Sequence, residues 1–306
     1  MTPLPACDDL VAVDHRHAGR AIVFVGLFGA SATASVIGAG HLSGLQLVAL
    51  GPLYLLSAAS LHGLSLFTHE GVHGSLAKRP VWNHVWSALA AWPVLQNFAA
   101  YRVLHLRHHK HLGAPGDPDH YANYTSLPPL EKAMHWGRLV AGYPAYLVAI
   151  PVLGFVRGDA RDRIGIVAEL AAELALIALA LRFLPPAALL HAWLIPMLLI
   201  NTMVNVRGMS QHTLLEDSDH EVRGSRTILT NRVTTFFMCN ENFHLEHHLY
   251  PRVPWYNLPA LHERLRERLD AEHAVFIPSY ASFVVDFVRA TFSRAKAPAP
   301  RLSSGV

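Results

Sequence analysis

The chain has 306 residues, of which 52% are hydrophobic and only 15% are charged, whereas an ordinary soluble domain carries about 25% charged residues. Its formal net charge of +3, with histidines neutral, is too small to indicate a nucleic-acid-binding surface. Only two cysteines are present, Cys7 and Cys239, which excludes a disulfide-based scaffold. The composition therefore favours a membrane protein that has no nucleic acid partner.

Four apolar runs are long enough to cross the hydrocarbon layer, which takes roughly 20 apolar residues. They are residues 21–40, 45–67, 164–184 and 187–206. The first two runs, and likewise the last two, are joined by connections so short that each pair must be antiparallel. The sequence thus predicts an all-α, multi-pass fold with four transmembrane helices, preceded by a cytoplasmic N-terminal segment, residues 1–20.

Three histidine clusters carry most of the chemical information. The first has the spacing H-x-x-x-H, and the other two have the spacing H-x-x-H-H. Because residues three and four apart share one face of a helix, each cluster points its imidazoles in one direction. The histidines concerned are His69, His73, His105, His108, His109, His244, His247 and His248.

Eight clustered imidazoles are more than one metal ion needs, since structural zinc takes four ligands and catalytic zinc usually takes three from the protein. Two metal ions are the simplest explanation, and His212, just past the last predicted span, is a ninth candidate ligand. Imidazole binds iron well, and two irons held by imidazole can activate dioxygen to remove hydrogen from a C–H bond. In a membrane, the substrate would be a lipid tail, and exclusion of water would protect reactive intermediates.

A shared metal site requires all three clusters to lie on one side of the membrane. The number of crossings between clusters must then be even, and the last pair of spans already supplies two. The weaker apolar runs, residues 81–98 and 139–156, are therefore predicted to lie in the interface or to re-enter the membrane; Pro144 and Pro151 interrupt the second. Basic residues such as Lys78 are concentrated on the side of the membrane that carries the histidine clusters. The positive-inside rule therefore places the clusters on the cytoplasmic side of the cell membrane.

The C-terminal part of the chain contains no further predicted span. Residues 258–273 have leucines at helical spacing with charges between them, which predicts an amphipathic surface helix. Residues 276–292 are interrupted by a proline and charges, and are expected to pack against the domain or lie in the interface. Residues 21–295 are thus read as one membrane domain, and 296–306 as a disordered tail.

Further segments flank the histidine clusters. Gly116-Asp117-Pro118-Asp119 follows the second, Asn240-Glu241-Asn242-Phe243 precedes the third, and Leu249-Tyr250-Pro251-Arg252-Val253-Pro254 follows it. With these segments the sequence resembles the membrane fatty acid desaturases, a family of histidine-box di-iron enzymes. The resemblance implies that the eight box histidines and His212 bind two iron ions. It also implies O2-dependent desaturation of an acyl chain or lipid, with electrons from a separate donor such as a ferredoxin or cytochrome b5 type protein.

The sequence leaves two alternatives open. Hydroxylases and ketolases of the same superfamily, which act on lipids, carotenoids or small molecules, share the boxes and begin with the same hydrogen abstraction. An enzyme of another class is suggested by His69-Glu70-Gly71-Val72-His73, which also matches the H-E-x-x-H motif of zinc proteases. That intramembrane zinc protease would use two of the nine histidines and leave the others unexplained.

Five residues near the boxes are candidates for orienting the metal ligands. Asp117 and Asp119 are predicted acceptors for imidazole N–H groups. Glu70 and Glu246 lie within boxes and are weighed for the same role against simple exposure to water. Asn240 is considered as a substitute for an asparagine that some relatives carry four residues before the extra histidine, where this chain has Gly208.

Overall fold

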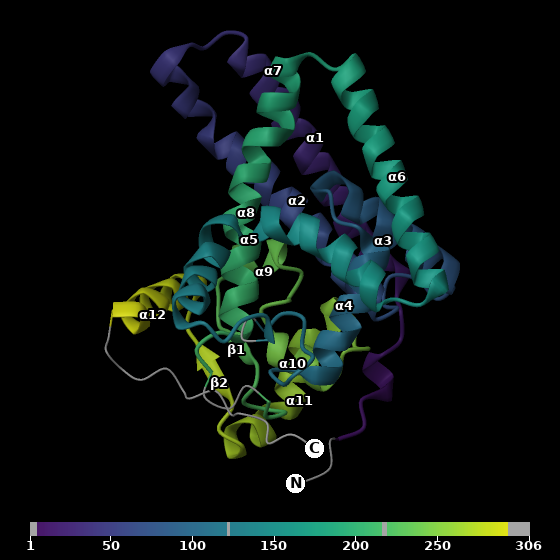
Figure 1. Ribbon diagram of the computed structural model, residues 1–306, viewed down its shortest axis with the longest axis vertical. Coiled ribbons are helices and arrows are strands. Elements are labelled where there is room, and N and C mark those ends of the chain that lie inside the picture. The colour runs from purple at the N-terminus through teal and green to yellow at the C-terminus, as the bar shows by residue number, and fades with distance from the viewer. Residues whose placement is uncertain (1–4, 121–122, 216–218, 293–306) are drawn as a thin grey trace.

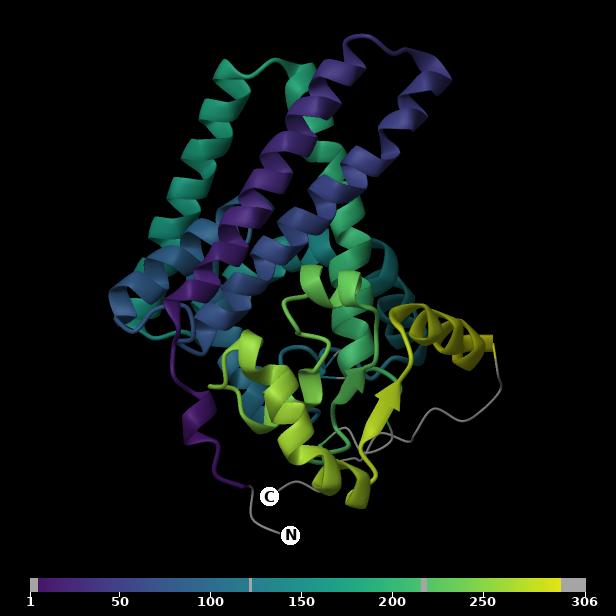
Figure 2. The same ribbon diagram turned by 180° about the vertical axis from the view of Figure 1, so that it is seen from behind.

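Two pairs of long antiparallel helices form one end of the molecule (Figure 1). The elements are α1 (Gly19–Ala39), α2 (Gly51–Val72), α6 (Ala160–Phe183), α7 (Pro186–Leu189), a π-helical turn at Leu190–Leu194 and α8 (Ile195–His212). The computed structural model describes residues 5–120, 123–215 and 219–292, so the predicted tail 296–306 lies outside the described residues. From behind, the connection between α1 and α2 lies at the same end as that between α6 and α7 (Figure 2).

The outward surfaces of these helices are apolar. On α6, the side chains of Ile164, Leu174 and Leu181 are 71%, 58% and 68% exposed. Large apolar side chains exposed along a whole helix mark contact with lipid rather than with water. Together with the length of the helices, this identifies a membrane protein, as the composition predicted.

The largest difference from the sequence prediction is α5 (Pro128–Arg157), where only a short interfacial stretch was expected. α5 has 30 residues, with both Pro144 and Pro151 inside it and a kink at Ala141. Among the described residues, five helices are long and apolar enough to cross a membrane, and α5 is one of them. In Figure 1, α5 runs across the two helix pairs rather than along them.

Two asparagines of α8 explain why Pro144 does not end α5. Pro144 removes the N–H that would bond to the carbonyl of Val140. Asn201 Nδ2 donates to this carbonyl at 2.7 Å, and Asn201 Oδ1 accepts from the Tyr143 N–H at 3.3 Å. Asn205 Nδ2 lies 3.3 Å from the Leu139 carbonyl. A neighbouring helix thus satisfies the backbone groups freed by the kink, which the sequence of α5 alone does not reveal.

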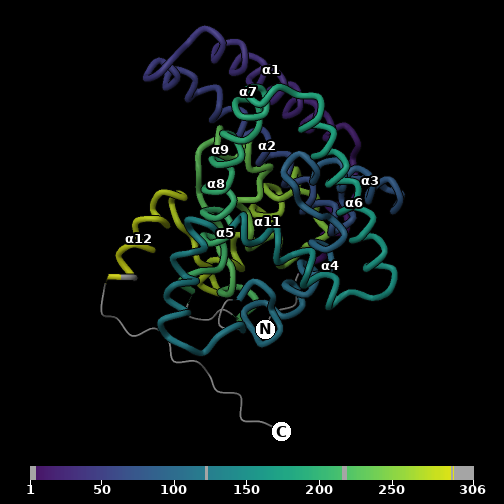
Figure 3. The backbone as a smooth tube through the Cα atoms, turned by 45° about the horizontal axis from the view of Figure 1, so that its top comes forward, coloured from purple at the N-terminus to yellow at the C-terminus, as the bar shows by residue number. Residues whose placement is uncertain are grey.

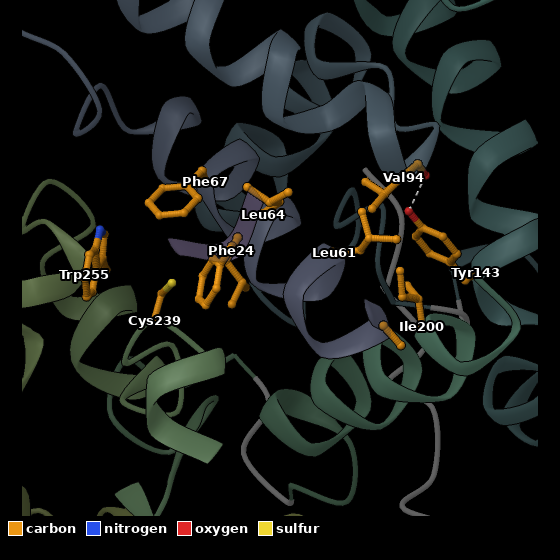
Figure 4. Close-up of a cluster of buried hydrophobic side chains, with 11 residues drawn as sticks. Phe24, Leu61, Leu64, Phe67, Val94, Tyr143, Ile200, Cys239 and Trp255 are labelled. Carbon is orange, nitrogen blue, oxygen red and sulfur yellow. Dashed lines mark hydrogen bonds between the residues drawn. The ribbon is translucent and has the colours of Figure 1, made fainter. Parts of the chain in front are cut away.

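The buried contact between α1 and α2 extends into the polar end of the molecule. Phe24 on α1 packs against Phe67 on α2, with ring centroids 6.2 Å apart, and the ring of Trp255 contacts Phe67 from the other side. Figure 4 shows these rings in one cluster with Cys239, and also shows the bond of Tyr143 Oη to the Val94 carbonyl, which is 2.6 Å long. This cluster connects the membrane helices to the segments around the third histidine box.

Shorter elements form the polar end. They are α3 (Pro80–Ala91), α4 (Phe98–His111), β1 (Arg226–Ile228), α9 (Arg232–Phe237), α10 (His244–Leu249), α11 (Leu258–Ala271), β2 (Val275–Ile277) and α12 (Tyr280–Phe292). The predicted amphipathic helix is confirmed as α11, which buries Leu258, Leu261, Leu265 and Leu269. The two strands, which the sequence did not predict, pair in parallel, with Thr227 opposite Phe276.

The predicted interfacial stretch 276–292 is divided between β2 and α12. Phe283 and Phe287 of α12 are buried in a cluster with Met209 of α8. In Figure 3, α12 lies at the edge of the molecule beside α5 and α8. The stretch is therefore packed against the domain, which was one of the two predicted positions; the other was the membrane interface.

The N-terminus of α4, the helix that carries the second box, is held by side chains. Asn97 Oδ1 accepts from the Ala100 N–H at 2.9 Å, which is an N-cap bond. Glu169 Oε2 accepts from the Ala99 N–H, also at 2.9 Å, so an acidic group of α6 faces the positive end of the α4 dipole. These bonds fix the N-terminus of α4 against α6, more than one helical turn before His105, the first histidine of the box.

Gly154 allows α5 and α4 to approach closely, which gives a first prediction. A Cβ at residue 154 would lie 2.7 Å from Ala100 Cβ and 2.8 Å from Ala100 Cα, so Gly154→Ala would push the backbones apart. We expect the substitution to destabilise the protein by about 1–3 kcal/mol, the usual cost of overpacking. Thermal unfolding in detergent would measure this loss.

Gly137→Ala is the matched control, because it lies in the same helix with nothing within 4 Å of its added Cβ. It should leave the unfolding temperature unchanged or raise it slightly, since alanine favours helix over glycine by about 1 kcal/mol. Equal effects of the two substitutions would contradict the close approach of α5 and α4.

Candidate metal centre

The nine predicted histidines meet where α2, α4, α8 and α10 end or pass one another. Ligand atoms of five of them lie within 4.8 Å of one another, and we call these cluster 1: His69, His73, His105, His109 and His247. His108, His212 and His248 form a second such group. His244 joins it, with its Nε2 3.0 Å from His212 Nε2 and 3.1 Å from His248 Nε2, and we call these four cluster 2.

Helical spacing explains how the boxes are divided. Residues four apart stay together: the pairs His69/His73 and His105/His109 belong to cluster 1, and His244/His248 belongs to cluster 2. The middle histidine of each H-x-x-H-H box points to the other cluster, so His108 joins cluster 2 and His247 joins cluster 1. Boxes two and three therefore exchange one ligand each, which links the two clusters.

The distances between nitrogens fit shared metal ions. His105 Nε2 lies 3.1 Å from His73 Nε2 and 3.0 Å from His109 Nε2. A metal–imidazole bond is about 2.1 Å long, and two ligands at right angles on one ion then lie about 3.0 Å apart. Hydrogen bonding does not explain the arrangement, because a single Nε2 has either one N–H or one lone pair to offer. Both nitrogens of buried His69 also lack any hydrogen-bond partner, as expected of a group that awaits a ligand.

Burial keeps the imidazoles of cluster 1 neutral. It lowers the pKa of His73 to about 3 and that of His109 to about 2, and neighbouring histidines add to the shift. Metal binding requires the neutral imidazole with a free lone pair. Cluster 1 is thus in its ligating form at neutral pH.

Asp117 is hydrogen-bonded to His108. The Nδ1–H of His108 donates to Asp117 Oδ1 at 2.9 Å, which turns Nε2 toward cluster 2. Burial alone would lower the pKa of His108, but the Asp117 bond and the nearby carboxylates outweigh it and raise that pKa. The Asp117 carboxylate also accepts the backbone N–H groups of Gly113 and Asp119, so its own position is fixed. Asp119 itself is 3.8 Å from His108 Nδ1 and bonds instead to Tyr146 Oη at 3.1 Å.

Glu241 is an orienting residue that the sequence reasoning missed. Its Oε1 accepts from His244 Nδ1 at 2.7 Å and lies 3.4 Å from His69 Nε2, so it contacts one histidine of each cluster. Glu241 stands three residues before His244, a spacing that brings two side chains to the same face of a helical turn. That spacing was the available signal. The backbone carbonyl of Gly224, which accepts from His212 Nδ1 at 3.0 Å, carried no signal in the sequence.

Besides Asp119, three more of the predicted orienting residues do not hydrogen-bond to a metal-site histidine. Glu70 accepts from Ser75 Oγ at 2.7 Å and from the Trp255 N–H at 3.0 Å, so it joins box one to the segment after box three. Glu246 is fully buried rather than facing water, and it accepts from Thr227 and His262. Asn240 donates to the Trp255 carbonyl at 2.9 Å. These residues hold the polar end together around the histidines.

Comparison with known proteins matches residues 45–280, which include all three histidine boxes of this chain, to the fatty acid desaturase family. The chain belongs to this family. Dihydrorhizobitoxine desaturase of Bradyrhizobium elkanii is 29% identical to it over 269 residues, which cover 76% of this chain and 71% of that protein. The chloroplastic omega-6 fatty acid desaturase of Arabidopsis thaliana is 24% identical, covering 73% of this chain but only 56% of the longer relative. Beta-carotene ketolase of a Paracoccus species is 25% identical over 209 residues, or 65% of this chain and 73% of the ketolase.

Membership of the desaturase family makes the protein an oxidoreductase and argues against the zinc protease. The site agrees, because a protease of the H-E-x-x-H type needs Glu70 free to act as general base. Glu70 is instead buried in two hydrogen bonds to the protein. His69 and His73 share their cluster with three further histidines.

The two aspartates after box two allow a matched test of ligand orientation. Asp117→Asn should weaken metal binding in cluster 2 by about 10- to 100-fold, the usual cost of removing a carboxylate behind a ligating histidine. Metal content would be measured by elemental analysis after dialysis against a graded series of chelator concentrations.

Asp119→Asn is the control, since Asp119 does not hydrogen-bond to His108. It should retain metal at chelator concentrations that strip Asp117→Asn. If both variants released metal together, Asp117 would have no special role in holding His108.

Proposed function

We propose that this protein is an O2-dependent di-iron oxidoreductase that desaturates an acyl chain or another lipid. The observation that carries the proposal is the pair of linked clusters, five and four imidazoles, with Nε2 atoms about one ligand–ligand distance apart. Zinc has no redox chemistry, whereas iron suits imidazole ligands and can be oxidised and reduced. Family membership supports iron over the other metals that bind imidazole.

The chain's own residues would hold two ions by dividing the nine histidines. His69, His73, His105, His109 and His247 would hold one ion, and His108, His212, His244 and His248 the other. Bound there, the irons would supply reductive activation of dioxygen and removal of hydrogen from a C–H bond. Asp117 and Glu241 keep the N–H of their histidines on Nδ1 and the lone pair on Nε2. Burial of the site excludes water, which would otherwise consume the oxidant.

Each desaturation would consume one dioxygen, two electrons and two protons, besides the two hydrogens taken from the substrate, and would form two waters. The electrons must come from outside the site, because histidines and carboxylates do not supply them. A cavity of about 320 Å³ reaches His109 and His248 from the polar end and is lined by Lys110, Asp219 and Glu221, among others. A separate carrier of the ferredoxin or cytochrome b5 type would donate electrons on this side.

We propose that four helices, α1, α2, α6 and α8, cross the cell membrane and that α5 lies in the interface. With four crossings, the C-terminal ends of α2 and α8 lie on the same side of the membrane. This agrees with the presence of His73 and His212 in one site. The crosswise course of α5 in Figure 1 supports the interfacial position. Basic residues are concentrated on the side of the membrane that holds the histidines, whereas only Arg182 lies near the two connections on the opposite side. By the positive-inside rule, this distribution favours a cytoplasmic site.

Hydroxylation or ketolation is the second candidate, supported by the similarity to beta-carotene ketolase. Both reactions begin by removing hydrogen, and they diverge when a second hydrogen leaves or oxygen is added. Expression in a bacterial host, followed by mass spectrometry of total lipids, would separate them. We expect products lighter by two hydrogens. Products heavier by one oxygen would favour the hydroxylase, and no new product in a host supplied with an electron donor would argue against a lipid substrate.

The division of the histidines predicts that single substitutions remove single irons. His108→Ala should deplete cluster 2 and His247→Ala should deplete cluster 1, and each should abolish activity. Iron per chain, measured with Mössbauer spectra, should fall from two to about one in each variant, with different species remaining.

The control is His41→Ala, an exposed histidine in the connection between α1 and α2. It should retain two irons and full activity. Full turnover by His108→Ala or His247→Ala with a depleted site would refute the assignment.

A further inference from the structure

Arg207 places a positive charge inside the bundle, close to the proposed metal site. It lies on α8, five residues before His212, the last residue of that helix. At 1.5 Å per residue, this is about 7.5 Å along the helix axis on the membrane side of His212. The side chain is partly buried, and its Nε atom is fully buried.

The guanidinium of Arg207 has no protein partner among the described residues. Its Nε forms no hydrogen bond, and no carboxylate of these residues lies within ion-pair distance of its other nitrogens. Ionisable groups kept within membrane helices commonly serve binding or transport. The arginine is therefore missing a negative partner.

Two hydrogen-bond donors in this part of the molecule also lack a partner. Gln211 lies one turn further along α8, and its Nε2 is buried and unpartnered. The hydroxyl of Tyr280, at the start of α12, is also buried and unpartnered. An arginine, an amide N–H2 and a phenol together suit a ligand that accepts hydrogen bonds.

The charge of Arg207 acts on Tyr280 and on Glu241, the carboxyl group that contacts the metal-site histidines. Burial raises the pKa of Tyr280, and the Arg207 charge opposes this rise. Burial likewise raises the pKa of Glu241, again opposed by Arg207. Glu241 is engaged with His244 and forms no ion pair with Arg207.

We propose that Arg207, with Gln211 and Tyr280, binds the carboxylate of the substrate, so that the substrate is an acyl chain with a free carboxylate that is oxidised only a few bonds from that carboxylate. Arginine binds carboxylates through two parallel hydrogen bonds, which would also fix the direction of the substrate toward the irons. A carotenoid, or an ester-linked acyl chain attacked at its middle, offers no carboxylate at this position. This inference rests on the proposed function and narrows its substrate class.

Equilibrium binding tests the proposal without turnover. Isothermal titration of the purified, iron-loaded full-length chain in nanodiscs would compare hexanoate with hexanamide, which differ only in the charged group. We expect the wild-type protein to bind hexanoate at least tenfold more tightly than hexanamide. Arg207→Met should weaken hexanoate binding about 10- to 100-fold, the range for losing a charge-assisted hydrogen-bonded pair, and leave hexanamide binding unchanged.

The control removes a positive charge elsewhere. Arg182→Met, at the far end of α6, should bind hexanoate as the wild type does. Arg207→Lys, which keeps the charge and loses the planar fork, should fall between wild type and Arg207→Met, and it serves as the decisive variant if Arg207→Met does not fold. Equal binding of the acid and the amide by wild type, or undiminished hexanoate binding by the Arg207 variants, would overturn the proposal. Iron content is measured on the same samples, so loss of metal, which would count against the proposed function, is distinguished from loss of the carboxylate site.

Discussion

The convergence of nine imidazoles in one buried site is the constraint on which the rest of the structure depends. Each imidazole can offer a metal only the nitrogen that is not already bonded. Asp117, Glu241 and the Gly224 carbonyl take the N–H of three histidines from three different elements. Lone pairs gathered this closely have no favourable interaction among themselves, so the surrounding helices must hold them in place before any metal arrives.

Close packing and local strain provide that rigidity. Gly71 lies between the two histidines of box one, where a Cβ would stand 1.7 Å from Ser87 Oγ, so α2 can meet α3 only through a glycine. Before box three, Cys239 and Asn240 adopt positive φ angles of 45° and 56°, which is unfavourable for residues with side chains. This turn delivers Glu241 to its histidine, and the Asn240 bond to Trp255 stabilises it. The strain is local, and the packed frame around it offsets its cost.

Reactivity and substrate choice are carried by different parts of the molecule. The histidines and their acceptors define an oxidising centre that serves desaturation and hydroxylation alike. The part of α8 on the membrane side of His212 differs from a purely apolar lipid-binding surface. It carries the charge of Arg207, which forms no ion pair among the described residues. Apolar helices around a polar, donor-rich interior fit a membrane enzyme whose substrate is itself partly polar.

Local patterns determined much of this protein from the sequence alone. Four apolar runs, the amphipathic helix at α11 and the spacing of the boxes depend on residues close together in the chain, and the nine histidines do converge. Tertiary contacts decided the rest. α5 continues through Pro144 because asparagines 58 or more positions away bond to its backbone, and His108 and His247 were assigned to opposite clusters only once α4 and α10 were placed face to face. The missing partner of Arg207 is likewise visible only in three dimensions, because a sequence shows which charges exist and the fold decides which of them meet.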